Sequence, residues 1–82
     1  MGRTKRQKPK RLARKLLAIR LELGVSQTQM AKLLRLKKAY TAVSAYERGA
    51  REPDLLVLLR YAKLAHASID VLVDDMKDLP RK

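Results

Sequence analysis

Apolar residues in the first part of the chain recur at the spacing of a helix. Four of them follow one another at steps of four, three and four residues: Leu12, Leu16, Ile19 and Leu23. This spacing places the side chains on one face of a helix of about four turns. Gly24 comes next, at the position where a residue in the left-handed conformation commonly ends a helix.

A second, shorter helix is predicted over residues 27–34. Ser26 supplies an N-cap hydroxyl and Gln29 stands three residues later, which is the spacing of a capping box. Two turns of helix do not persist alone in water, so this segment depends on packing against other helices. Its expected core-facing residues are Met30, Ala31, Leu33 and Leu34.

A third helix is predicted after a polar connection over residues 35–39. Val43 and Tyr46 lie three residues apart and form its inward face. It stops at Gly49, again a glycine placed to end a helix. In the loop that follows, Pro53 keeps the preceding residue out of the helical conformation.

Two more helices are predicted in the remainder of the chain, each preceded by a capping residue, Asp54 and Ser68. The first of them ends near residues 65–66. Its expected core-facing residues are Leu55, Leu58, Leu59 and Ala62, and those of the last helix are Ile69, Leu72 and Val73. No stretch alternates as a strand does, so the pattern predicts an all-α fold of five helices.

We expect the helices to form one domain over residues 10–75. Residues 1–9 have no apolar periodicity and are mostly basic or polar, which predicts a disordered arm. Residues 76–82 form a charged tail, in which Pro80 ends any helix.

The charge is large and unevenly distributed. Twenty Lys and Arg stand against eight Asp and Glu, for a net charge of +12. Residues 1–51 hold fifteen basic and two acidic residues, whereas residues 52–82 hold five and six. Solubility gives no reason for this asymmetry, whereas a polyanionic partner does, so the charge favours nucleic acid.

Several function classes are excluded by the composition. Without Cys there is no disulfide and no thiolate metal site, and the single His66 does not make a metal site without several carboxylates beside it. The longest apolar run, residues 55–59, is too short to span a membrane. No nucleophile–base pair, phosphate loop or metal-ligand spacing occurs, so we expect no enzyme, no cofactor, no metal and no membrane partner.

Two short helices with a longer helix before and after them are the layout of a helix-turn-helix DNA reader. In such a reader the first short helix directs its N-terminal amides toward a phosphate. The second lies in the major groove and offers side chains to base edges. The segment around residues 41–48 is therefore the element expected to enter the groove.

Two motifs resemble the Xre, or lambda-repressor-like, family of phage repressors. They are S-Q-x-x-Φ-A at residues 26–31, where Φ is apolar, and Y-E-R-G-x-R-x-P at residues 46–53. The similarity covers roughly residues 16–73. It implies a five-helix helix-turn-helix bundle that binds double-stranded DNA in a sequence-specific way and regulates transcription, as a repressor.

The chain departs from the family at two glycine positions and in one length. Arg35 stands where a glycine usually follows the second helix, and His66 where one usually lies between the fourth and fifth. His tolerates positive φ better than most residues, so we expect His66 to have a structural role. The connection from Leu34 to Val43 is about two residues longer than usual, which bears on where the groove helix begins.

The resemblance implies a set of DNA contacts on and around the two short helices. Gln27 matches a position that reaches a phosphate or braces the groove helix. Thr41 suits a base edge or a phosphate, and Ala45 a thymine methyl. Four basic residues flank the groove helix as phosphate clamps. The full expected set is Ser26, Gln27, Lys37, Lys38, Tyr40, Thr41, Ser44, Ala45, Arg48 and Arg51.

Three of these residues have an alternative role. Ser26 either caps only or also touches a phosphate. Tyr40 stacks, bonds a phosphate or packs back on the protein, and Ser44 reads DNA, caps or faces solvent. No Arg or Asn stands at the centre of the groove helix, so we expect modest sequence discrimination per monomer.

The family also pairs an arginine on the first helix with the glutamate of the Y-E-R-G motif. Arg20 and Glu47 match these positions. We expect them to form a partly buried ion pair that holds the groove helix against the first helix.

The sequence leaves partners and roles open. A homodimer is expected from the family, with Val71, Val73, Met76 and Leu79 either forming the contact or covering the core. The alternative function is a protein-interaction module, such as an antitoxin or a coactivator, with a protein partner. The basic arm either follows a DNA groove, serves nuclear import or adds non-specific affinity. We expect a cytoplasmic, nucleoid-associated protein, or a nuclear one in a eukaryote.

Overall fold

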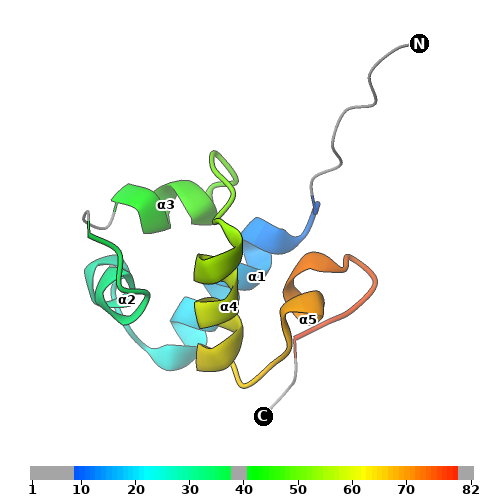
Figure 1. Ribbon diagram of the computed structural model, residues 1–82. Helices are drawn as coiled ribbons and strands as arrows, with labels where there is room; N and C mark the ends of the chain where they lie inside the picture. Colours follow the sequence, from blue (N-terminus) through cyan, green and yellow to red (C-terminus); the bar gives the residue numbers. More distant parts are fainter. Residues whose placement is uncertain (1–8, 38–40, 80–82) are drawn as a thin grey trace.

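Figure 1 shows the helices arranged around α1 in the computed structural model, which describes residues 9–37 and 41–79. Within these ranges the helices are α1 (Leu12–Leu23), α2 (Gln27–Leu33), α3 (Thr41–Glu47), α4 (Leu55–Leu64) and α5 (Ile69–Val73). The predicted five-helix all-α fold is confirmed, and the described residues form no strand. Most of the predicted arm, residues 1–8, lies outside the described part of the chain, so its disorder stays a prediction.

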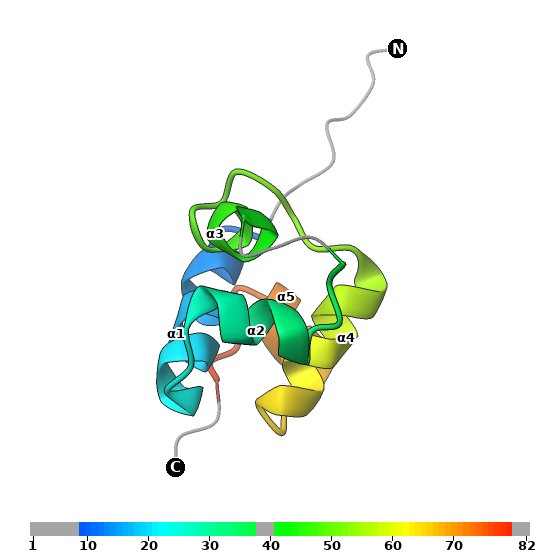
Figure 2. The same ribbon diagram turned by 90° about the vertical axis from the view of Figure 1, so that its left-hand side faces the viewer.

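The core lies where the helices meet. α1 packs against α3, α4 and α5, and α2 packs against α3, which lies directly above it in Figure 2. Each helix contributes a fully buried side chain: Leu16, Met30, Val43, Tyr61 and Leu72. Removing such side chains from water is the main force that holds helices this short together.

The helix ends follow the sequence signals closely. Ser26 Oγ accepts a hydrogen bond from Gln29 N at 3.0 Å, and Gln29 Oε1 accepts one from Ser26 N at 2.9 Å, so the predicted capping box is present. Gly24 ends α1 at a φ of 72°. Asp54 caps α4 by accepting a hydrogen bond from Val57 N at 3.0 Å. Ser68 occupies the N-cap of α5, but its side chain makes no capping hydrogen bond.

The predicted buried face of α4 was wrong in part. Leu58 and Ala62 are buried as expected, but Leu55 and Leu59 are 73% and 39% exposed. Val57 and Tyr61 face the core in their place. Tyr61 follows Val57 by four residues and Leu58 by three, so the three side chains lie on the same side of the helix. The run over residues 55–59 is apolar throughout, so its pattern does not specify a face, and packing against α1 and α5 decides it.

Two other predicted core residues lie nearer the surface. Leu33, the last residue of α2, is 45% exposed, while its neighbour Leu34 is fully buried. Val73, the last residue of α5, is 37% exposed. Both stand at the end of a short helix, where the next turn that would cover them is missing.

The segment after α5 returns to the start of α1. The Asp75 carboxylate accepts hydrogen bonds from Lys10 N at 2.9 Å and Arg11 N at 3.0 Å. The Arg11 guanidinium bonds the Asp75 carbonyl oxygen at 2.7 Å and pairs with the Asp78 carboxylate. Leu79 packs against the core, so ordered contacts extend past residue 75, the expected end of the domain.

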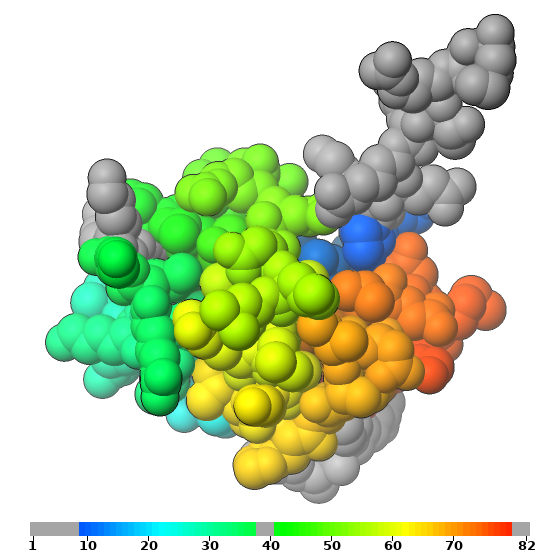
Figure 3. All heavy atoms as spheres, in the orientation of Figure 1, coloured from blue at the N-terminus to red at the C-terminus, as the bar shows by residue number. Residues whose placement is uncertain are grey.

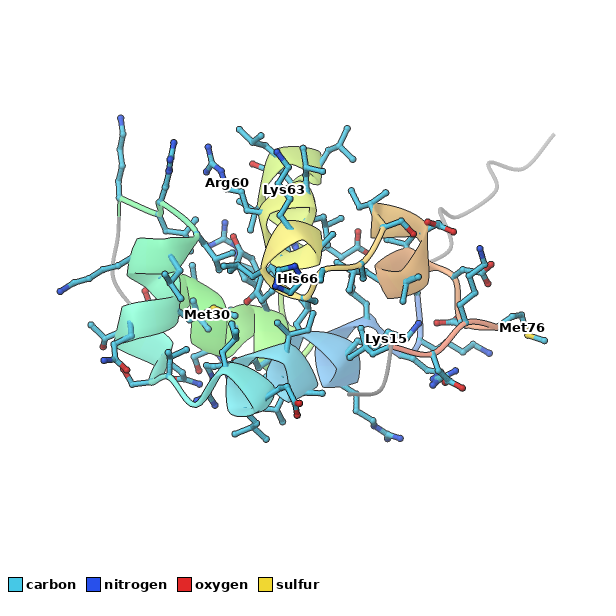
Figure 4. The ribbon with its side chains drawn as sticks, turned by 90° about the horizontal axis from the view of Figure 1, so that it is seen from below. Lys15, Met30, Arg60, Lys63, His66 and Met76 are labelled. Carbon is cyan, nitrogen blue, oxygen red and sulfur yellow. The ribbon has the colours of Figure 1, made fainter. Side chains whose placement is uncertain are left out.

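Lys15 connects α1 to the end of α5. Its side chain is buried among the apolar residues of α1, and Nζ donates to Val71 O at 2.7 Å and to Asp74 O at 2.9 Å (Figure 4). Burial lowers the pKa of this ammonium group from its ordinary value.

No helix in residues 9–37 and 41–79 has the length and apolar character to cross a bilayer.

Candidate nucleic-acid interface

α3 is held in place by its last residue, Glu47. Glu47 Oε2 accepts from Arg20 Nε at 2.6 Å, and Oε1 accepts from Arg20 Nη2 at 3.1 Å. The side chains of Arg20 and Glu47 are only 16% and 5% exposed. The ion pair expected between α1 and α3 is therefore present, and its bidentate geometry restricts both side chains.

Two further hydrogen bonds extend this anchor. Gln27 Nε2 donates to Glu47 Oε1 at 3.1 Å, and Arg20 Nη1 donates to Val25 O at 3.1 Å. The hydrogen bond to Glu47 raises the pKa of the Arg20 guanidinium, against the opposing effect of burial. Gln27 thus braces α3, one of the two roles expected for it.

The outward face of α3 is a stripe of three polar residues. Thr41 and Arg48 are exposed and Ser44 is partly exposed, and their spacing of three and four residues keeps them on one side of a helix. Arg48 follows the last residue of α3, but its backbone N–H still donates to Ser44 O at 3.0 Å, so the stripe continues for one more position. Its Nε also donates to Ser44 Oγ at 3.3 Å.

Ala45 does not belong to this outward stripe. It was expected beside Thr41 and Ser44, but it is only 8% exposed and lies on the buried side with Tyr46. Its spacing of four residues from Thr41 would place it near the stripe, but the loop after α3 turns back at this residue, and the N–H groups of Ala50 and Arg51 donate to Ala45 O at 2.9 and 3.3 Å. Ala45 therefore offers little exposed surface to a thymine methyl.

Arg51, in the loop after α3, is placed beside the same helix. Its side chain is exposed, and its guanidinium carbon lies 5.8 Å from the centre of the Tyr46 ring. A cation–π contact of this kind restricts the arginine without neutralising it. Arg51 is therefore held beside α3 with its charge available.

The start of α2 lies close to the anchor. Ser26 is exposed, but its hydroxyl oxygen accepts the capping hydrogen bond described above. Thr28, which the sequence reasoning did not single out, is exposed in the first turn of α2. Its position two residues after the N-cap places it among the N-terminal amides of α2, and this could have marked it as a candidate for a phosphate contact.

The connection between α2 and α3 is described only in part. Lys37 is exposed, whereas Lys38 and Tyr40 lie outside the described residues. Arg35 has a φ of 58° and His66 a φ of 55°, so both take the left-handed conformation that glycine usually supplies at these places. The structural role expected for His66 is consistent with this backbone.

Most of the basic arm lies outside the described residues, so the structure places few of its side chains. Arg3, Lys5, Arg6 and Lys8 lie outside the described residues, and Lys10 is exposed. Arg11, the residue directly before α1, bonds Asp75 and Asp78. Within the described ranges no three His, Asp or Glu side chains gather as a metal site would require.

Comparison with known proteins agrees with this geometry. The model of the helix-turn-helix family HTH_3 matches residues 16–72, which include α2, α3 and α4 in full, the last two thirds of α1 and all but the last residue of α5. No curated protein and no solved structure matches the chain.

Proposed function

Because this chain belongs to the Xre, lambda-repressor-like helix-turn-helix family of DNA-binding regulators, we propose that it is a sequence-specific transcriptional repressor that inserts α3 into the major groove. The observation that carries this proposal is the polar stripe of Thr41, Ser44 and Arg48. It stands on a helix whose opposite side is held by the Arg20–Glu47 pair. A reading helix needs both features, an exposed polar face and a rigid base.

The residues on and beside the stripe divide into those that contact base edges and those that contact phosphates. Thr41 and Ser44 carry hydroxyls that donate and accept at base edges. Arg48, at the end of the stripe, is suited either to guanine or to a phosphate. Arg51 and Lys37 flank the helix as positive charges that contact phosphates without reading sequence.

The exposed apolar residues supply a surface for the expected dimer. Of the residues expected at the contact, Leu79 packs against the core, while Met76 is 89% and Val73 37% exposed; Leu55 and Leu56, adjacent to each other at the start of α4, are 73% and 55% exposed. We propose that these two leucines pair two copies, so that two α3 helices read half-sites about one DNA turn apart. Sedimentation analysis of Leu55→Ser/Leu56→Ser against the parent tests this, and equal masses for both would contradict it.

Selection of bound sequences from a random duplex pool tests the function itself. We expect an enriched motif with two-fold symmetry, which Thr41→Ala/Ser44→Ala weakens without loss of the fold by circular dichroism. Recovery of no motif, while the chain captures a protein of its source cell through Leu55 and Leu56, would overturn the proposal. That outcome would favour the interaction module in its place.

A further inference from the structure

A second basic surface lies outside the site described above, where the C-terminal halves of α2 and α4 meet. We call it the α2–α4 basic face, and it consists of Arg35, Arg60 and Lys63. Residues 25–37 and 55–66, which contain it, include no Asp or Glu. In Figure 3 these two segments lie side by side on the face toward the viewer.

One hydrogen bond joins the two halves of this face. Arg60 Nη1 donates to Leu34 O at 2.9 Å, which ties α4 to the end of α2. Lys63 is exposed one turn further along α4, and Figure 4 shows both side chains on the side of α4 away from α1. Arg35 is exposed and directly follows Leu34, whose carbonyl oxygen Arg60 bonds.

This face points in a different direction from the α3 stripe. α3 packs on α1 and α2, so its exposed side is the one away from them, toward the top of Figure 1. α4 lies in front of α1 in the same view. A straight duplex along α3 therefore does not follow the α2–α4 basic face as well, because duplex DNA resists bending over so short a distance.

The backbone at Arg35 has a conformation that carries a steric cost for residues other than glycine. Its φ of 58° places a non-glycine residue in the left-handed region, where the Cβ crowds the following carbonyl oxygen. A glycine adopts the same backbone without this strain. Compared with glycine, arginine at this position is strained but adds a positive charge. Backbone strain of this kind is often found at functional sites.

We propose that the α2–α4 basic face binds the phosphate backbone of a second DNA duplex while α3 occupies the groove of the first. This rests on the proposed DNA-binding function and extends it to two duplexes joined by one chain. Arginine and lysine side chains fit phosphates, and the two segments that carry them, residues 25–37 and 55–66, contain no carboxylate. Binding at this face is therefore independent of sequence and falls steeply with salt.

A two-duplex capture experiment tests this. One biotin-labelled duplex is immobilised and saturated with the protein, and a fluorescent random-sequence duplex is then added over a range of salt concentrations. The parent is expected to retain the second duplex at low salt. Binding of the first duplex alone is measured in parallel, so that failure of the proposed function is seen separately.

Two variants and one control complete the design. Arg35→Gly is expected to lower the salt slope of second-duplex capture by about 0.9, while its melting temperature stays equal or rises and first-duplex binding is unchanged. Lys63→Glu lowers capture further. Arg14→Glu, at an exposed position of α1, changes the net charge by the same amount as Lys63→Glu and is expected to capture like the parent.

Each outcome decides the proposal. A parent that binds one duplex and never retains a second overturns it. So does capture that Arg35→Gly and Lys63→Glu leave unchanged, since two α3 helices of a dimer would then be the bridge. Loss of capture in Arg14→Glu equal to that in Lys63→Glu would assign the effect to net charge and also overturn it.

Discussion

The Glu47 carboxylate accepts both hydrogen bonds of a bidentate pair with the Arg20 guanidinium, at 2.6 and 3.1 Å. This contact joins the last residue of α3 to the C-terminal half of α1 across 27 positions of sequence. Because Gln27 bonds the same carboxylate, the orientation of α3 depends on one nearly buried group shared by three helices.

Replacement of Arg20 tests this anchor. Arg20→Ala leaves the Glu47 carboxylate buried with one neutral partner, and we expect a loss of about 3–5 kcal/mol in the free energy of unfolding. Urea denaturation followed by circular dichroism measures it. Glu22→Ala, at an exposed position of the same helix, serves as the control, and an Arg20→Ala variant as stable as that control would refute the anchor.

Ser26→Ala tests the capping box of α2. The change removes the hydroxyl oxygen that accepts from Gln29 N, so the free energy of unfolding is expected to fall by about 1 kcal/mol. Thr28→Ala, two positions further on in the same helix, is the comparison in the same denaturation experiment. Equal stabilities for the two variants would show that the cap contributes nothing.

His66 tests the left-handed position after α4. His66→Gly relieves the strain of its φ of 55°, and we expect a gain of up to about 1 kcal/mol after the extra freedom of glycine in the unfolded chain is subtracted. His66→Val adds a β-branched side chain at the same φ and is expected to lose about 1 kcal/mol or more. Thermal melting should rank Gly above His and His above Val; the reverse order would contradict the assignment.

Arg51 tests the phosphate contacts beside α3. Arg51→Gln is expected to weaken DNA binding for all sequences alike and to lower the salt slope of the association constant by about 0.9, because one phosphate contact is lost. Fluorescence anisotropy titrations at several salt concentrations measure both quantities. Arg14→Gln should keep the parent slope, and an Arg51→Gln slope equal to it would remove Arg51 from the interface.

Asp75 links the stability of the fold to acid pH. Hydrogen bonds from the backbone N–H groups of Lys10 and Arg11 hold the pKa of Asp75 below its ordinary value of 3.8. A carboxylate with a depressed pKa contributes stability that is fully present above pH 3.8 and is lost as the pH falls through the lower value of the folded state.

The corresponding variant is Asp75→Asn. It is expected to be less stable than the parent at neutral pH, and the difference should shrink as the pH falls below about 3.8, since the parent loses the charged group as well. Melting temperatures over a pH series measure this, with Glu22→Gln as a control that keeps the parent profile. A difference between Asp75→Asn and the parent that stays constant into acid would contradict the linkage.

Local signals in the sequence were sufficient for the helices and their ends. The spacing of Leu12, Leu16 and Ile19 needs no distant partner to define a face, and Gly24 and Asp54 act on backbone groups within their own turn. The motifs around Ser26 and Glu47 also predicted the ion pair that anchors α3. A family resemblance implies such a pairing between distant residues, whereas composition and spacing do not.

The tertiary structure decided which side chains are buried, because burial depends on which helices pack against one another. The apolar run of α4 offers leucines on every side, so only packing against α1 and α5 chose Val57 and Tyr61 over Leu55 and Leu59. Ala45 is buried although its spacing from Thr41 places it near the outward stripe. Lys15 lies on the apolar face of α1, a signal that could have been noticed, but the carbonyl oxygens it bonds are more than 50 residues away. Sequence determines what each segment can form by itself, whereas burial is a property of pairs of segments that only the folded chain brings together.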